Sequence, residues 1–165
     1  LIIITTLVGV GIGWGKPVPM DPSKMRNPRW DHFAAVAAGP MSNLLQAIVF
    51  AIMMRGYVLV AGAIGLQATS FLFIFLFLGV IINLSLFLFN LLPIGMLDGM
   101  WLVSSFLPDP LRLGWVRFNL SFGSFLFIGL ILMGQLGGGS VFGTILRPAS
   151  SSLLRILTGV DADIW

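Results

Sequence analysis

Long apolar runs separated by short polar connectors dominate this chain. Residues 34–54 contain no charged side chain and end at Arg55, and residues 57–97 are also uncharged. At 1.5 Å per residue, a helix over either run is long enough to cross about 30 Å of hydrocarbon. The second run begins with glycines and polar residues and becomes dense in Phe, Leu and Ile from Phe71. The pattern predicts spanning helices over 34–54 and 71–94, with an interfacial stretch over 57–70.

The two ends of the chain carry further apolar segments. Residues 1–13 lack the charged start of a signal peptide, and we expect them to be the end of a membrane segment that begins before Leu1. Residues 119–146 are apolar but are interrupted by glycines at 137–139. This region predicts either a spanning or a re-entrant segment, and the pattern leaves both open. Residues 147–165 then form a tail.

Two connectors, 14–33 and 98–118, carry most of the charge. Basic residues exceed acidic ones in 14–33, which predicts a cytoplasmic location by the positive-inside bias, and Arg112 and Arg117 in 98–118 are consistent with a return to the same side. Four prolines exclude a continuous helix over 14–33: Pro17, Pro19, Pro22 and Pro28. Extended backbone in this connector could offer an edge to a peptide, although a plain surface loop is the alternative.

Composition places the chain among membrane proteins. Hydrophobic residues make up 58% of the sequence and charged residues only 9%, whereas soluble domains carry about a quarter of their residues as charged types. We therefore predict an all-α fold, a polytopic transmembrane helical bundle with kinked or broken helices in a lipid bilayer. The sequence has no basic run with interleaved aromatic residues, the pattern that would indicate nucleic-acid binding. The absence of cysteine excludes disulfides and thiolate sites.

Asp98 is the only charged residue between Arg55 and Asp109, at the end of a long apolar run. A carboxylate near a bilayer core is costly, so such residues usually face a partner, a cavity or a metal. The alternative is a turn at the membrane surface in which Asp98 caps the next helix.

Amides also interrupt the apolar runs. Asn43 follows Pro40 by three residues, so the pair could bind a peptide backbone or tie two helices together. Asn83 and Asn90 are seven residues apart, which places them on one face of a helix, where the same two explanations apply.

Several short motifs occur in a fixed order along these segments. They are G-W-G-K-P-V-P-M-D-P at 13–22, R-N-P-R at 26–29, G-P-x-x-N at 39–43, N-x-x-P at 90–93 and L-D-G at 97–99. Together they resemble the site-2 protease family of intramembrane zinc metalloproteases, in particular its compact bacterial members. The resemblance covers nearly the whole chain and implies a multi-pass protein of the bacterial inner membrane.

The resemblance implies a zinc ion (Zn2+) held by two histidines of an H-E-x-x-H helix and by Asp98. Three protein ligands leave one position for a water that attacks a peptide bond. The expected partner is the transmembrane segment of a protein or peptide substrate. Asn43, Asn90 and Pro93 match positions that would border it, and Pro93 would also end or unwind its helix.

One departure from the family pattern is large. The chain contains no Glu and only one histidine, His32, so H-E-x-x-H is not among its residues. We expect that motif on a helix ahead of Leu1 and expect this chain alone to be inactive. His32 lies in a polar connector and is better explained as an interfacial residue than as a substitute ligand. A noncatalytic membrane relative and a transporter or channel element are the alternative functions.

Overall fold

The computed structural model describes residues 24–63, 71–95, 97–135 and 141–159, and all of their regular structure is helical. The helical fold class is therefore confirmed. The predictions for residues 1–23 lie outside the described residues. The elements, in order, are α2 (Pro28–Ala63), α3 (Phe71–Asn90), α4 (Asp98–Phe106), α5 (Asp109–Phe118), the π-helix η2 (Asn119–Gly123), α6 (Ser124–Gln135) and α7 (Val141–Thr158).

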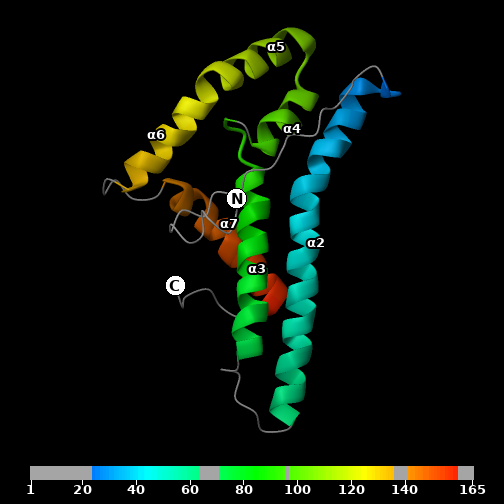
Figure 1. Ribbon diagram of the computed structural model, residues 1–165, viewed down its shortest axis with the longest axis vertical. Helices are drawn as coiled ribbons and strands as arrows, with labels where there is room; N and C mark the ends of the chain where they lie inside the picture. The colour runs from blue at the N-terminus through cyan, green and yellow to red at the C-terminus, as the bar shows by residue number, and fades with distance from the viewer. Residues whose placement is uncertain (1–23, 64–70, 96, 136–140, 160–165) are drawn as a thin grey trace, which may run out of the picture.

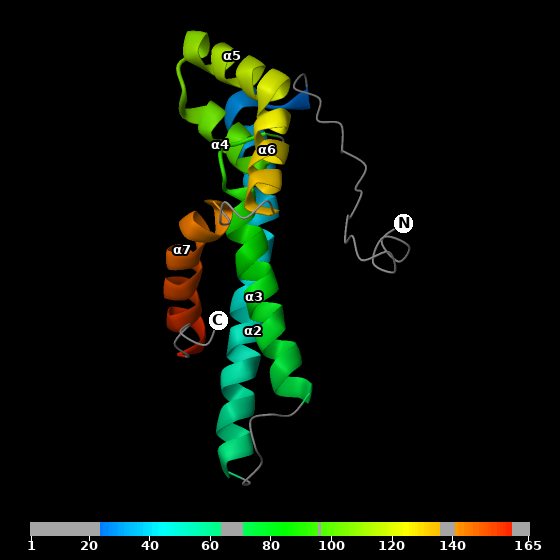
Figure 2. The same ribbon diagram turned by 90° about the vertical axis from the view of Figure 1, so that its left-hand side faces the viewer.

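Helices α2 and α3 lie side by side in both ribbon views and form the centre of the molecule (Figures 1 and 2). Small residues make this approach possible, as is typical of helix pairs in membranes. Ala47 and Ala51 are buried on α2, and a side chain at Gly79 of α3 would meet the Phe50 ring at 2.6 Å. Helix α7 completes the core by packing Leu154 against this pair.

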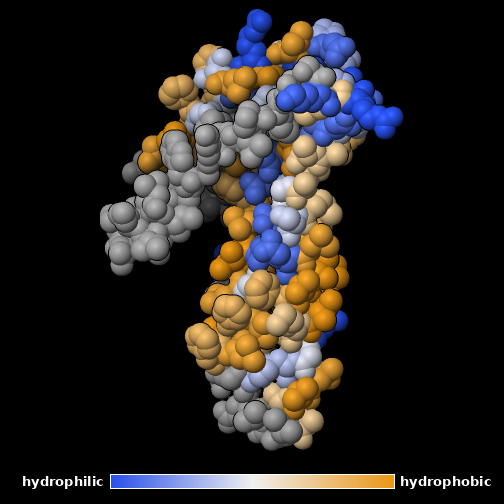
Figure 3. Space-filling model, turned by 45° about the vertical axis from the view of Figure 1, so that its right-hand side comes forward, coloured by the Kyte–Doolittle hydropathy of each residue, from blue (hydrophilic) through white to orange (hydrophobic). Residues whose placement is uncertain are grey.

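The outward faces of these helices carry large apolar side chains. On α3, for example, Phe71 is 84% exposed and Ile82 is 54% exposed. Apolar surface of this extent is not expected on a soluble monomer, but it suits contact with lipid tails. Three segments are long and apolar enough to cross a membrane, namely Pro28–Ala63, Phe71–Asn90 and Asp109–Leu130. Figure 3 shows the hydrophobic surface of the lower part of the molecule.

Helix α2 is longer at both ends than the predicted 34–54. It begins at Pro28, a position where the missing N–H of proline removes no helical hydrogen bond. It continues through the buried Pro40 and past Arg55, whose guanidinium donates a hydrogen bond to the Ile156 carbonyl of α7 at 2.9 Å. Residues 57–63 are thus part of α2 rather than of a separate interfacial stretch, and 64–70 lie outside the described residues.

The predicted loop at 98–118 is instead two short helices, α4 and α5. Arg29 of α2 stabilises the end of α4 by donating hydrogen bonds to the carbonyls of Ser105, at 2.7 Å, and Leu107. These carbonyls have no partner within the helix, so a guanidinium is a suitable cap. The sequence pattern missed α4 and α5 because a few turns held by such tertiary contacts leave little apolar periodicity.

The C-terminal boundaries also differ from those predicted. The third membrane-capable segment starts at Asp109, ahead of the predicted 119, because α5, η2 and α6 follow one another without a break. Helix α7 covers residues 141–158, so most of the described part of the predicted tail is helical. Residues 136–140, which include the glycine-rich interruption, lie outside the described residues.

Pro93 lies in the non-helical segment that separates α3 from α4. Helix α3 ends at Asn90, in agreement with the prediction that Pro93 ends or unwinds it. After the break, α4 packs against the end of α3 so closely that a side chain at Gly99 would lie 2.2 Å from the Leu91 carbonyl oxygen and 2.5 Å from that of Leu92. Only glycine fits between the two backbones at this point.

Replacing Gly99 by Ala should therefore destabilise the protein by roughly 1–3 kcal/mol, because backbone atoms must move to admit the methyl group. Thermal unfolding in detergent, followed by circular dichroism, measures the change. Gly114→Ala is the matched control, since a methyl group at this position of α5 would have no other atom within 4 Å. Equal midpoints for the two variants would contradict the close contact.

Candidate functional site

Asp98 is the first residue of α4, and its half-buried side chain faces α2. A side chain at Gly39 would lie 3.0 Å from the Asp98 carboxylate oxygen Oδ2, so this carboxylate lies directly against the backbone of α2. The structure thus brings the L-D-G motif and the G-P-x-x-N motif together, although they are almost sixty positions apart in the sequence.

The Asp98 carboxylate accepts no hydrogen bond and forms no ion pair with any described residue. Helix α4 does begin at Asp98, but its N-cap is Leu97, and no side chain caps the helix. Partial burial raises the pKa of the Asp98 carboxyl above its usual value. The capping alternative is therefore wrong, since no side chain caps α4, and no described residue pairs with the Asp98 carboxylate.

Hydrogen bonds to α5 and η2 fix the backbone on both sides of Asp98. Before it, the Gly95 N–H donates to Oδ1 of Asn119 at 3.1 Å, and the side-chain amide of Asn119 donates to the Trp115 carbonyl at 3.1 Å. After it, the Met100 carbonyl accepts a hydrogen bond from Nε1 of Trp115 at 3.0 Å. The segment that presents Asp98 is thus held at two points by one neighbouring helix.

The loop that leads into Asp98 contacts the π-helix η2. Gly95 has a φ of +69°, a conformation that side chains disfavour, and a side chain at Gly123 would lie 2.8 Å from the Gly95 Cα. Asn119, only 2% exposed, begins η2. Short π-helices are frequent at functional sites, and this one brings the Asn119 side chain to the loop that leads into Asp98.

The predicted substrate-side residues lie on α2, at the end of α3 and in the break before α4. Asn43 is half-buried one helical turn beyond Gly39 on α2, which is about 6 Å along the axis. Asn90 is the half-buried last residue of α3, and Pro93 is exposed in the break that follows. Figure 3 shows a band of hydrophilic side chains over the surface where α2 faces α3. No contact tests what these three residues bind, so their role in substrate binding stays a prediction.

A complete zinc site is not present in the described residues. No three residues among His, Cys, Asp and Glu lie together in the part of the chain that the structure describes. His32 stacks edge to face on Trp101, with ring centroids 5.3 Å apart, and lies seven residues before Gly39, about 10 Å along α2. The described residues therefore give no support to His32 as a substitute ligand beside Asp98.

Comparison with known proteins identifies the family of this chain. The sequence model of peptidase family M50 matches residues 12–132, a range that contains Gly39, Asn43, Asn90 and Asp98. This chain belongs to peptidase family M50. The Bacillus subtilis (strain 168) protein named "Putative zinc metalloprotease YwhC" is 30% identical to it over 156 residues, which are 91% of this chain and 67% of that relative. No solved structure matches the chain.

The family match includes the sequence motifs, but it does not identify the residues that hold those motifs in place. The sequence analysis missed Asn119, Trp115 and Gly95, although an amide within an apolar segment four residues before Gly123 was a signal for helix contact. Their importance emerges only when α5 and η2 are seen to pack beside the break at Pro93.

Replacing Asn119 by Leu should destabilise the protein by roughly 1–3 kcal/mol, because the Gly95 N–H would lose its acceptor in a buried place. Thermal unfolding in detergent measures the loss. The control is Asn27→Leu, since Asn27 is exposed and its backbone, not its side chain, bonds Asp31. An unchanged midpoint for Asn119→Leu would mean that the hydrogen bond does not hold the loop.

Proposed function

We propose that this chain carries the aspartate ligand and part of the substrate site of an intramembrane zinc metalloendopeptidase. The observation that carries the proposal is the Asp98 carboxylate, which is partly buried against Gly39 without a partner among the described residues and is held in place from both sides. A group of this kind, in a member of peptidase family M50 with three membrane-capable helices, is a suitable metal ligand.

A complete set of zinc ligands requires residues that are not in this sequence. Catalytic zinc is usually held by three protein ligands, whereas Asp98 is the one candidate here, and the sequence has no Glu to act as a base. We infer that two histidines and a glutamate of an H-E-x-x-H helix come from another part of the protein. Bound between these groups, zinc would supply an activated water for attack on a peptide carbonyl.

The chain's own residues would then position the substrate. Asn43 and Asn90 each present an amide that can donate to a peptide carbonyl and accept from a peptide N–H. A transmembrane substrate must expose such groups when its helix unwinds for cleavage, and inside a bilayer they need protein partners. Both amides are half-buried, and both lie within a few residues of a backbone segment that contacts the Asp98 turn. This arrangement supports a role in holding an unwound segment near the metal ligand.

The substrate class follows from this placement. Single-span membrane proteins fit best as substrates, since Asp98, Asn43 and Asn90 lie on or beside helices that are themselves membrane-capable. We place the protein as a multi-pass protein of the bacterial inner membrane. A noncatalytic relative that binds membrane segments through Asn43 and Asn90 is the alternative, and zinc content separates the two.

Asp98→Asn in the complete protein should lower zinc affinity at least about tenfold and abolish cleavage of a single-span substrate, because the amide removes the ligand's charge but keeps its shape. Zinc content by mass spectrometry and cleavage in detergent measure both effects. Asp109→Asn is the matched control, since the Asp109 side chain is 78% exposed and lies outside the site. Retained zinc and cleavage in Asp98→Asn would refute the ligand assignment.

Gly39→Ala tests the contact between α2 and the carboxylate. A methyl group 3.0 Å from Oδ2 would displace Asp98 by a few tenths of an ångström, and small misplacements of catalytic groups cost large factors in rate, so cleavage should fall about tenfold. Helix stability should not fall, because alanine favours a helix. Gly56→Ala, on the same helix with no atom within 4 Å, should leave cleavage unchanged. A wild-type cleavage rate in Gly39→Ala would contradict the proposed geometry.

A further inference from the structure

A second polar site lies at the end of the molecule where α2 begins. A partly open cavity of about 320 Å3 is bordered there by the first turns of α2, by α4 and by α5. Its walls include Arg29 and His32 from α2, Trp101 from α4, and Arg112, Leu113 and Val116 from α5. This volume is at the lower end of the range for small-ligand sites. The metal-ligand proposal for Asp98 does not use any of these residues.

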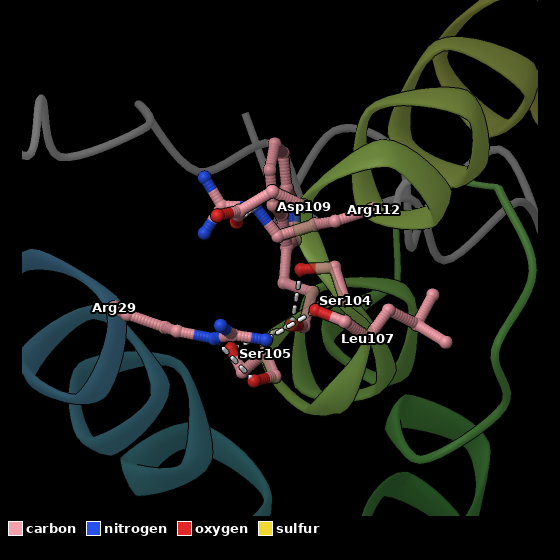
Figure 4. A network of polar contacts seen from close by, with 7 residues as sticks. Arg29, Ser104, Ser105, Leu107, Asp109 and Arg112 are labelled. Carbon is pink, nitrogen blue, oxygen red and sulfur yellow. Dashed lines mark hydrogen bonds and ion pairs between the residues drawn. The ribbon is translucent and has the colours of Figure 1, made fainter.

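The cavity is lined by two arginines and by no acidic residue among those described. Arg29 uses Nε and Nη2 to hold the end of α4, which leaves the donors on Nη1 (Figure 4). Arg112 approaches Asp109 at 3.9 Å through Nε alone, and Asp109 is exposed. Two guanidinium groups from different helices therefore border one space, an arrangement that favours an oxyanion such as phosphate.

The remaining walls suit the neighbouring parts of a lipid headgroup. Ser104 and Ser105 line the cavity, and both hydroxyls donate to the Trp101 carbonyl, so their oxygens can accept a hydrogen bond from a headgroup hydroxyl. Leu113 and Val116 provide an apolar wall. The cavity thus combines cations, acceptors and apolar surface.

The position of the cavity corresponds to the membrane surface. Two of the three membrane-capable segments begin beside it, at Pro28 and at Asp109. Trp30, Phe33 and Phe106 form an aromatic cluster at the same end, with ring centroids 5.3–5.8 Å apart, as is typical of an interfacial belt. Figure 3 shows hydrophilic side chains gathered at this end of the molecule. Phosphate groups of lipids occupy that depth of a bilayer.

We propose that this cavity binds the phosphate group of an anionic phospholipid, with Arg29 and Arg112 contacting the phosphate oxygens. A glycerol headgroup fits the acceptors on Ser104 and Ser105 and adds no positive charge. A choline headgroup would bring a quaternary ammonium beside two guanidinium groups, with no described acidic residue in the wall to balance it. The site therefore selects phosphatidylglycerol over phosphatidylcholine.

The test is native mass spectrometry of the purified full chain in a nonionic detergent, titrated with each lipid separately. The wild type should bind one phosphatidylglycerol about tenfold more tightly than phosphatidylcholine. Arg112→Gln should remove this preference, whereas Arg117→Gln, which makes the same charge change on the same helix outside the cavity, should keep it. Arg112→Lys, which retains the charge, should keep most of the preference and shows that the fold tolerates a change at this position.

Three outcomes would overturn the proposal. Equal losses in Arg112→Gln and Arg117→Gln would indicate general surface charge instead of this cavity. Equal affinity of the wild type for both lipids would remove the headgroup selection. Inorganic phosphate at millimolar concentration should not displace the lipid, and displacement would identify a site for free phosphate instead.

Discussion

The close contact between Gly99 and the end of α3 is the constraint on which the rest of the site depends. Because position 99 has no side chain, α4 can start against the Leu91 and Leu92 carbonyls, immediately after the break at Pro93. That packing sets the direction of the first turn of α4, and the first residue of this turn is Asp98. A larger residue at 99 would force α4, and with it Asp98, to shift from this position. The glycine of the L-D-G motif therefore serves the position of its aspartate.

Three further glycines extend the same principle to the neighbouring helices. Gly39 lets the backbone of α2 approach the Asp98 carboxylate, and Gly95 with Gly123 lets the loop approach η2. Hydrogen bonds through Asn119 and Trp115 then hold the loop without contacting the carboxylate itself. The result is a half-buried carboxyl group without a partner among the described residues, and its charged form is costly in a membrane protein unless a cation or a donor comes from elsewhere.

The sequence predicted the parts of this structure that follow from apolar length and from local rules. The spanning segments of α2 and α3, the break at Pro93 and the isolated charge of Asp98 all appear in the pattern of charged and apolar residues. Helix ends were predicted less well, since α2 begins at Pro28 and passes Arg55 through contacts with α7 that no local pattern reveals. Helices α4 and α5 and the Asn119 contact were missed for the same reason, because distant residues such as Arg29 and Gly95 stabilise them.

The central claim is that Asp98 binds zinc together with ligands from outside this sequence. Anomalous diffraction at the zinc edge, from crystals of the complete protein, tests it most directly because it locates the metal without reference to activity. If Asp98 is a ligand, one zinc peak should lie about 2.0–2.2 Å from an Asp98 carboxylate oxygen, with two histidine nitrogens completing the protein ligands. A zinc ion bound away from Asp98, or a carboxylate paired with a protein donor in the zinc-loaded crystal, would contradict it.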